Sequence, residues 1–364
     1  MRKRNGWVLL LLFVSMLISG CSYGDETPQD DVVEMNYLQE DGCYQYYYET
    51  LNAKEKKIYE EIYNGVIEHR KHIAVSTNEE AIMKEMIDKV LSDHAELFYC
   101  KNMFPLCGEQ QGEIVVHYEK DLTDDALKTL QEQLQNEVKR VVSQMDASAS
   151  DYEKAKFVYE YIVQNCEYEE SAKNNQDVRS VIFYGKSVCA GYAHTAQMLL
   201  NALGVKCAYL SGKAIDEEGK ESLHAWNVIE INDDYYYMDS TWGDAKDPDH
   251  ICYGYFMMSE SEMRSLYEPD YETSSTQVYD NSYIETNTYV TVYDENLITM
   301  ILEQALQNGN RVAEIKCAPQ CYEEVKNQLF GNHQIFSLFE KQGYYYDSVV
   351  HAENDRLCLI DIIL

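Results

Sequence analysis

Residues 185–193 read Gly-Lys-Ser-Val-Cys-Ala-Gly-Tyr-Ala, a loop that runs into Cys189 and then into an apolar helix. The buried face of this helix is predicted to carry Tyr192, Ala196, Leu199, Leu200 and Leu203. Gly204 follows the last apolar position and suits the left-handed residue that ends a helix. Cys189 therefore heads a helix, where unpaired N–H groups and the helix dipole stabilise a thiolate and can hold an oxyanion. The small neighbours Ala190 and Gly191 are expected to leave room for a substrate.

Three strands are expected after this helix, at residues 205–212, 223–231 and 235–239. Asn232-Asp233 is a strong turn signal between the second and third strands. If it forms a two-residue hairpin loop, Asp239 becomes the diagonal neighbour of His224 on one face of the sheet. Diagonal partners lie about 7 Å apart, within reach of a histidine–carboxylate hydrogen bond. The sequence thus offers a base and an orienting carboxylate for the Cys189 nucleophile.

Three motifs follow one another in a fixed order: G-K-S-V-C-A-G-Y-A around Cys189, H-A-W-N from His224, and D-S-T-W from Asp239. Together they resemble the transglutaminase-like superfamily, in its bacterial lipoprotein branch. The resemblance covers about residues 150–260. It implies a papain-like core in which the cysteine heads a helix and the histidine and aspartate lie on adjacent strands, and it implies that these three residues are catalytic.

One departure from the animal transglutaminases bears on the reaction. Those enzymes carry Gln before and Trp after the nucleophile, where this chain has Val188 and Ala190. Many relatives with the present pattern are thought to be peptidases, so the resemblance favours a peptidase or amidase that works through a thioester acyl-enzyme. A protein cross-linking acyl transferase and a catalytically silent surface scaffold are the alternatives. None of these requires a metal or an organic cofactor.

Other residues near the motifs have simpler interpretations. His194 lies five residues after Cys189, about 140° around the same helix, and is therefore a poor base candidate. Tyr184 either donates to an oxyanion or packs in the core, and the sequence leaves both open. Trp226 and Trp242 are expected to be walls of the cleft and core rather than catalytic groups.

No metal site is predicted. His69 and His72 lie three residues apart on an expected helix, but no third ligand is visible. No Cys/His cluster has zinc spacing. Asp244, Asp247 and Asp249 match no calcium loop and are expected to form a polar turn. An even number of cysteines remains once Cys21 is set aside, which permits disulfides, although most of them are expected to be buried small residues.

The N-terminus has the form of a bacterial export signal. Three basic residues (2–4) precede an apolar run from Trp7 to Ile18, which is too short to span a bilayer comfortably. The run ends in Ile-Ser-Gly-Cys, which resembles the lipobox of bacterial lipoproteins and implies cleavage after residue 20 and lipidation of Cys21. The expected location is the cell membrane, lipid-anchored on the extracytoplasmic face. An ordinary secretory signal or a plain membrane anchor is the alternative.

Charge excludes one class of partner. The chain has 63 acidic and 30 basic residues, and cleavage of residues 1–20 removes three of the basic ones, which leaves a net charge of about −36. Such an excess repels phosphate backbones, so no nucleic-acid partner is expected. A protein or peptide substrate is the expected partner besides the membrane itself, and cell-wall peptide and surface protein are the two candidates that the location suggests.

The fold class predicted is α+β, a transglutaminase-like core between an N-terminal helical region and a small C-terminal α/β domain. The expected segments are a signal peptide (1–20), a polar tether (21–44), an α-rich N-terminal domain (45–145), the catalytic domain (146–262), a linker (263–286) and the C-terminal domain (287–364). The catalytic domain is expected to open with a capping box at Ser150.

Overall fold

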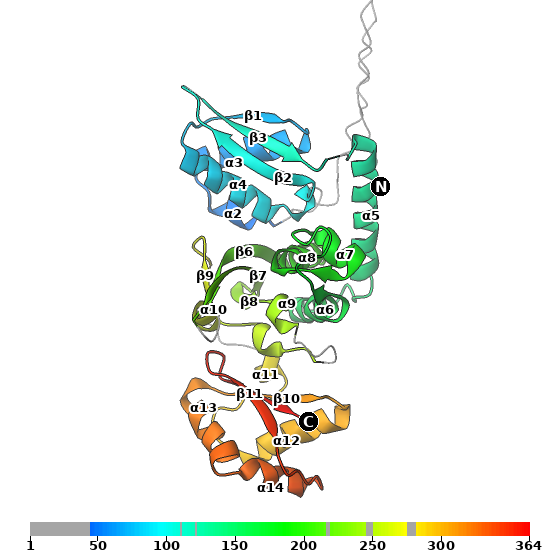
Figure 1. Ribbon diagram of the computed structural model, residues 1–364, viewed down its shortest axis with the longest axis vertical. Helices are drawn as coiled ribbons and strands as arrows, with labels where there is room; N and C mark the ends of the chain where they lie inside the picture. Colours follow the sequence, from blue (N-terminus) through cyan, green and yellow to red (C-terminus); the bar gives the residue numbers. More distant parts are fainter. Residues whose placement is uncertain (1–43, 110, 121, 216–218, 245–249, 275–281) are drawn as a thin grey trace, which may run out of the picture. The chain divides into compact units, whose positions relative to one another are not determined.

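The computed structural model describes residues 44–364, apart from 110, 121, 216–218, 245–249 and 275–281 (Figure 1). The predicted signal peptide, Cys21 and the tether up to residue 43 lie outside the described residues. In the part that is described, no helix is both long enough and apolar enough to cross a membrane. The described residues contain three antiparallel sheets of three or four strands, surrounded by helices, so the α+β class predicted from the sequence is correct.

The N-terminal region combines helices with an antiparallel sheet in the order β1-β3-β2. Its elements are α2 (Tyr46–Thr50), α3 (Ala53–Ile67), β1 (His72–Val75), α4 (Glu80–Asp93), the short η1 (Ala95–Leu97), β2 (Cys100–Leu106), β3 (Gly112–Tyr118) and α5 (Asp124–Val142). The Thr123 side chain caps α5 by accepting from the Ala126 N–H. One hydrophobic cluster runs from this region into the catalytic core, so the two share buried side chains.

Helix α3 is shorter than expected, and this separates the two candidate histidines. The helix ends at Ile67 rather than near His72, because His69 adopts a left-handed conformation with φ of 55°. The Nδ1 atom of His69 lies 3.2 Å from Asp124, whereas His72 is on β1 and its Nδ1 lies 2.6 Å from Glu113. Each histidine therefore has its own carboxylate partner, and they do not form a shared metal site.

The central region, called the catalytic core because it carries the residues predicted to be catalytic, is built on a four-stranded antiparallel sheet in the order β8-β7-β6-β9 (Figure 1). Its elements are α6 (Asp151–Asn165), β4 (Glu167–Tyr168), α7 (Val178–Tyr184), β5 (Lys186–Ser187), α8 (Cys189–Ala202), β6 (Lys206–Ile215), β7 (Glu221–Ile231), β8 (Asp234–Met238), α9 (Ser240–Gly243), η2 (Tyr253–Tyr255), α10 (Glu260–Leu266) and β9 (Tyr267–Pro269). The capping box at Ser150 begins α6 as predicted.

The hairpin between β7 and β8 has the register that the sequence suggested. Ile231 pairs with Asp234, and both turn residues have positive φ, 55° at Asn232 and 65° at Asp233. Two positive φ values are typical of the type I′ turns that join two strands closely. Because the loop has two residues, His224 and Asp239 lie on the same face of the sheet.

Helix α8 packs on β6 and β7, and a buried amide fixes it there (Figure 1). The Asn227 side chain on β7 donates to the carbonyl of Ala193 on α8 at 2.9 Å and to the carbonyl of Ala208 on β6 at 3.1 Å. Gly204 ends the helix with φ of 79°, as predicted. The start of α8 is therefore held against the strand that carries His224.

The C-terminal region contains an antiparallel sheet in the order β10-β12-β11. Its elements are α11 (Ser282–Glu285), α12 (Glu295–Asn308), β10 (Val312–Lys316), α13 (Pro319–Lys326), the π-helical η3 (Asn327–Gly331), α14 (Gln334–Lys341), β11 (Val350–Asn354) and β12 (Leu359–Ile363). Val290 forms a single bridge with Cys317, and β11 begins at Val350. Tyr345, in the segment before β11, is 81% exposed.

The core extends beyond the boundary expected from composition. Residues 263–286 were expected to be a linker, yet α10 continues to Leu266, and β9 pairs with β6 as an edge strand of the catalytic sheet. Tyr267 opens β9 and is 2% exposed. The segment is polar on average, and for this reason its few buried apolar residues were not recognised as part of the core.

Candidate active site

Cys189 is the first residue of α8, as the sequence predicted. The residue before it, Val188, has an extended backbone and donates from its N–H to the Asn175 carbonyl at 3.4 Å. The Ser187 hydroxyl donates to the same carbonyl at 3.1 Å and contacts Ser180 at 2.6 Å. These buried contacts fix the loop that delivers the thiol. The first N–H groups of a helix have no intrahelical partner, so those of Cys189 and its neighbour are available to an oxyanion.

Gly191 has a different role from the one expected. A β-carbon at this position would lie 2.1 Å from the Ser187 hydroxyl, 2.5 Å from that of Ser180 and 3.0 Å from the Asn175 carbonyl. The glycine therefore faces the buried loop rather than the substrate. It is needed because the backbone of α8 and the loop before Cys189 approach each other too closely for any side chain.

His224 and Asp239 form the hydrogen bond that the hairpin geometry predicted. The distance from His224 Nε2 to Asp239 Oδ2 is 2.7 Å, and the two residues are 8% and 1% exposed. With Nε2 engaged, Nδ1 is the ring nitrogen left for the nucleophile. Burial opposes a charge on His224, but the Asp239 carboxylate outweighs it and, together with a hydrogen bond to the Cys189 side chain, raises the pKa of His224 to about 10. The imidazole thus lies between a carboxylate and a thiol and remains protonated at neutral pH.

Four donors satisfy the Asp239 carboxylate. Its Oδ1 accepts from the backbone N–H groups of Thr241 at 2.9 Å and Trp242 at 3.1 Å, which makes Asp239 the N-cap of the short helix α9. Its Oδ2 accepts from His224 and from the Tyr267 hydroxyl at 2.6 Å. A buried carboxylate with this many donors is held in one orientation.

Tyr267 is the functional candidate that the sequence analysis missed. Besides donating to Asp239, its ring stacks on His224 with centroids 5.5 Å apart and on Trp226 with centroids 4.6 Å apart. Trp242 lies 5.1 Å from the His224 ring. Both tryptophans therefore form walls around the imidazole, as expected. The pairing of β9 with β6 brings Tyr267 to the site. Tyr267 lies outside the three sequence motifs, so the sequence did not mark it as a site residue.

We predict that Tyr267→Phe will lower the free energy of unfolding by about 1.5–3 kcal/mol, the usual contribution of a hydrogen bond to a charged group. It will also slow alkylation of Cys189 at pH 6 several-fold, because the carboxylate that orients His224 is held less firmly. Urea unfolding and peptide mass spectrometry measure the two effects. Tyr59→Phe is a matched control, since the Tyr59 hydroxyl donates to the buried Asp93 carboxylate at 2.9 Å in the N-terminal region and has no bond to Asp239. Equal slowing in both variants would mean that Tyr267 is merely structural.

The other residues considered in the sequence analysis are not part of the Cys189–His224–Asp239 arrangement. Burial lowers the pKa of His194 to about 4, and its ring stacks on Tyr209 with centroids 4.1 Å apart, so it is not the base. Tyr184 is 46% exposed at the end of α7, and its ring makes a cation–π contact with the Lys173 ammonium. Asp244 accepts from the Tyr192 hydroxyl at 2.6 Å. Asp247, Asp249 and Cys21 lie outside the described residues.

The nine described cysteines are all free, so no disulfide blocks Cys189, which is partly exposed. Two tyrosines lie near it that the sequence did not single out. Burial and the neighbouring Cys189 side chain raise the pKa of Tyr168 on β4, and the same two causes raise that of Tyr209 on β6. Tyr168 is 52% exposed, so it lies on the solvent side of the nucleophile.

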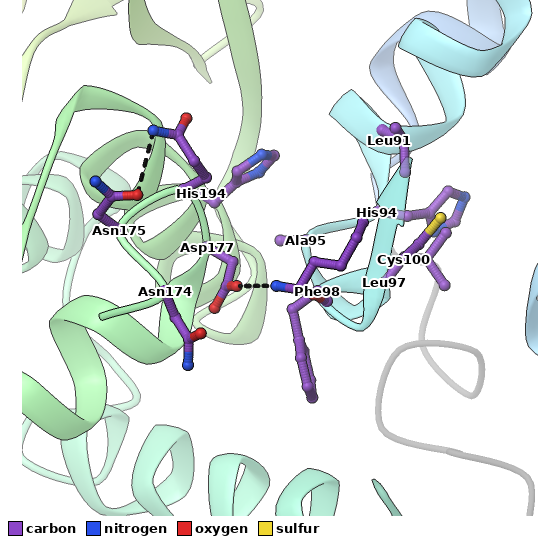
Figure 2. Close-up of a pocket in the computed structure, with 12 residues that line it drawn as sticks. Leu91, His94, Ala95, Leu97, Phe98, Cys100, Asn174, Asn175, Asp177 and His194 are labelled. Atoms are coloured by element: carbon purple, nitrogen blue, oxygen red, sulfur yellow. Dashed lines mark hydrogen bonds and ion pairs between the residues drawn. The ribbon is translucent and has the colours of Figure 1, made fainter. Parts of the chain in front are cut away.

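A cavity of about 310 Å³ lies beside the loop that carries Val188. Figure 2 shows its two sides: Asn174, Asn175, Asp177 and His194 come from the catalytic core, and Leu91, His94, Ala95, Leu97, Phe98 and Cys100 come from the N-terminal region. The Lys101 ammonium lies 3.4 Å from the Asp177 carboxylate across it. The N-terminal region thus builds part of this cavity, and the lining is partly apolar and partly charged.

Comparison with known proteins places this site in a family. The model of the transglutaminase-like superfamily matches residues 139–240, which include Cys189, His224 and Asp239. Kyphoscoliosis peptidase from Mus musculus is 26% identical over 106 residues, and the match spans 26% of this chain and 16% of the mouse protein. The chain therefore matches about a sixth of the length of that curated relative.

Two solved structures are also similar. A candidate cysteine protease from Cytophaga hutchinsonii has a TM-score of 0.28 and 14% identity, covering 50% of this chain and 80% of that one. A TGase structure has a TM-score of 0.26 and 15% identity, covering 41% and 46%. The sequence motifs, their geometry and the family match agree, and residues 139–240 of this chain form a domain of the transglutaminase-like superfamily.

Proposed function

We propose that this protein is a surface lipoprotein whose transglutaminase-like domain hydrolyses amide or peptide bonds through a thioester on Cys189. The observation that carries the proposal is the arrangement at the start of α8. A partly exposed thiol heads the helix beside His224, whose other nitrogen is bonded at 2.7 Å to the fully satisfied Asp239 carboxylate. This arrangement suits nucleophilic catalysis, in which a base activates the nucleophile and a third group orients the base.

In the first half of the reaction the Cys189 sulfur attacks the carbonyl carbon of the scissile amide. The developing oxyanion accepts from backbone N–H groups at the start of α8. His224 holds the proton taken from the thiol and delivers it to the leaving amine, so the C–N bond breaks and a thioester remains. Asp239 stabilises the charged imidazolium and fixes the orientation of the ring.

In the second half water attacks the thioester carbonyl. His224 removes a proton from that water and returns it to the sulfur as the C–S bond breaks, which releases a carboxylic acid and restores the thiol. A primary amine in place of water would give a transferase instead. We favour water because Val188 and Ala190 stand where the cross-linking enzymes carry Gln and Trp.

The substrate we propose is a protein or peptide outside the cell membrane, within reach of an anchor at Cys21. The cavity beside Val188 supports a substrate with side chains, since its volume of about 310 Å³ lies at the lower end of the range for ligand pockets. Its apolar and charged lining suits a peptide side chain.

The reaction type is tested with an activated peptidyl ester, followed by intact-protein mass spectrometry. We expect an acyl adduct on Cys189 that decays in water, and no adduct in Cys189→Ala. Cys107→Ala is the control, because Cys107 is an exposed free thiol away from the site. A labelled primary amine added in excess should be incorporated into casein only slightly. Efficient incorporation would identify a transferase, and the lack of any adduct would identify a non-catalytic scaffold.

A further inference from the structure

A second cluster of chemically reactive side chains lies apart from the nucleophile. His250 and Cys252 follow α9, and Asp361 is on β12; one ligand atom from each lies within 4.8 Å of the others. Glu314 on β10 adds a fourth group, since its Oε1 lies 3.7 Å from His250 Nε2. Nitrogen, sulfur and carboxylate oxygen atoms of His250, Cys252 and Asp361 therefore lie close together, with Glu314 beside His250.

The two carboxylates oppose each other across neighbouring strands. Glu314 on β10 is the direct partner of Asp361 on β12. Like charges directly opposite in a sheet are destabilising, and burial makes the repulsion worse. The cation on the same strand is already engaged, because the Lys316 ammonium bonds to Glu262 and to the Leu357 carbonyl. Lys316 therefore does not neutralise this pair of acids.

One oxygen of Glu314 is held while the other faces the cluster. Oε2 accepts from the Tyr253 N–H at 3.2 Å and the Tyr283 hydroxyl at 3.1 Å. Among the described atoms, Oε1 of Glu314 and Oδ1 of Asp361 are buried without a hydrogen-bond partner. The Glu314 side chain is only 9% exposed.

We propose that His250, Cys252, Glu314 and Asp361 bind one zinc ion. Zinc takes four ligands from imidazole, thiolate and carboxylate groups in a tetrahedron, whereas calcium and magnesium prefer oxygen ligands alone. With Zn–N and Zn–O bonds of about 2.0–2.1 Å, two ligand atoms of a tetrahedron lie about 3.4 Å apart. The 3.7 Å between His250 and Glu314 is close to that spacing. Four protein ligands leave no open position, so the site is structural.

The zinc would brace the segment that orients the base. The Cys252 N–H donates to the Gly243 carbonyl at 3.1 Å, and the Cys252 carbonyl accepts from the buried Tyr159 hydroxyl at 2.6 Å. Gly243 ends helix α9, whose N-cap is Asp239. The ion would thus join strands β10 and β12 to the segment that follows α9, the short helix capped by Asp239.

The experiment uses the full chain purified in detergent without chelator. Elemental mass spectrometry should find about one zinc per chain, and Asp361→Asn should lower zinc affinity at least tenfold with little change in shape. Cobalt exchanged for zinc should give a thiolate-to-cobalt charge-transfer band that Cys252→Ser removes. Cys317→Ser is the matched control, since Cys317 is buried in the C-terminal core near Cys321 and Cys358.

The experiment still tests the zinc site if Cys252→Ser does not fold. In that case the wild-type cobalt band and its loss in Asp361→Asn still test the site. A chain that retains no zinc and gives no cobalt band would overturn the proposal. So would a band that survives in Asp361→Asn and disappears in Cys317→Ser, because the metal would then belong to the C-terminal cysteines.

Discussion

Cys189 will be alkylated rapidly at pH 6, and His224→Ala will slow that reaction at least tenfold. An ordinary thiol is almost wholly protonated at pH 6 and reacts slowly there. His224 stays protonated at this pH, since Asp239 raises its pKa to about 10, and the imidazolium favours a thiolate beside it. Peptide mass spectrometry of iodoacetamide-treated protein between pH 5 and 9 measures the rate for each cysteine separately.

The chain contains its own reference for this measurement. Cys107 is free and exposed, and it should react slowly at pH 6 in every variant. His117→Ala is the matched histidine control, because His117 is exposed on β3 of the N-terminal sheet. If Cys189 and Cys107 react alike at every pH and His224→Ala changes neither, the thiol and imidazole do not act as a pair and the scaffold alternative gains support.

The local part of the site could be predicted from the sequence because neighbouring residues determine it. A Gly-Ser loop followed by apolar residues at helical spacing placed Cys189 at the start of α8. A two-residue turn fixed the register of β7 and β8, and the register brought His224 to Asp239. Each step needed only residues on one helix or one hairpin.

The parts that could not be predicted depend on contacts between distant segments. Tyr267 reaches Asp239 because β9 pairs with β6 at the edge of the sheet. The polar composition of residues 263–286 did not indicate a strand there. The zinc ligands we propose come from one loop and two strands, with gaps that match no zinc spacing motif. The role of Gly191 was misjudged because its neighbours, Ser180 and Asn175, come from other parts of the chain.

The second large effect is expected at Asp239. Asp239→Ala leaves four donors without an acceptor in a site that is 1% exposed: two backbone N–H groups, the His224 imidazole and the Tyr267 hydroxyl. Removing one member of a buried charged pair costs about 3–5 kcal/mol. Asp239→Asn keeps the cap through its carbonyl oxygen and should cost less. Both variants should lose the rapid labelling of Cys189 at pH 6, since burial alone disfavours the protonated form of His224.

The pH dependence of stability distinguishes the charge of Asp239 from its shape. A histidine with a raised pKa contributes stability that is fully present below about pH 6.5 and is lost as the pH rises towards 10. The stability deficit of Asp239→Asn in urea should therefore be largest at pH 6 and shrink towards pH 10. Asp294→Ala is the control, since Asp294 caps α12 with bonds of 2.8 and 3.3 Å to two backbone N–H groups, far along the chain from the site. It should cost about 1 kcal/mol at every pH and leave Cys189 labelling unchanged. A deficit in Asp239→Asn that does not vary with pH would mean that Asp239 acts as a helix cap alone and that the charged state of His224 does not depend on it.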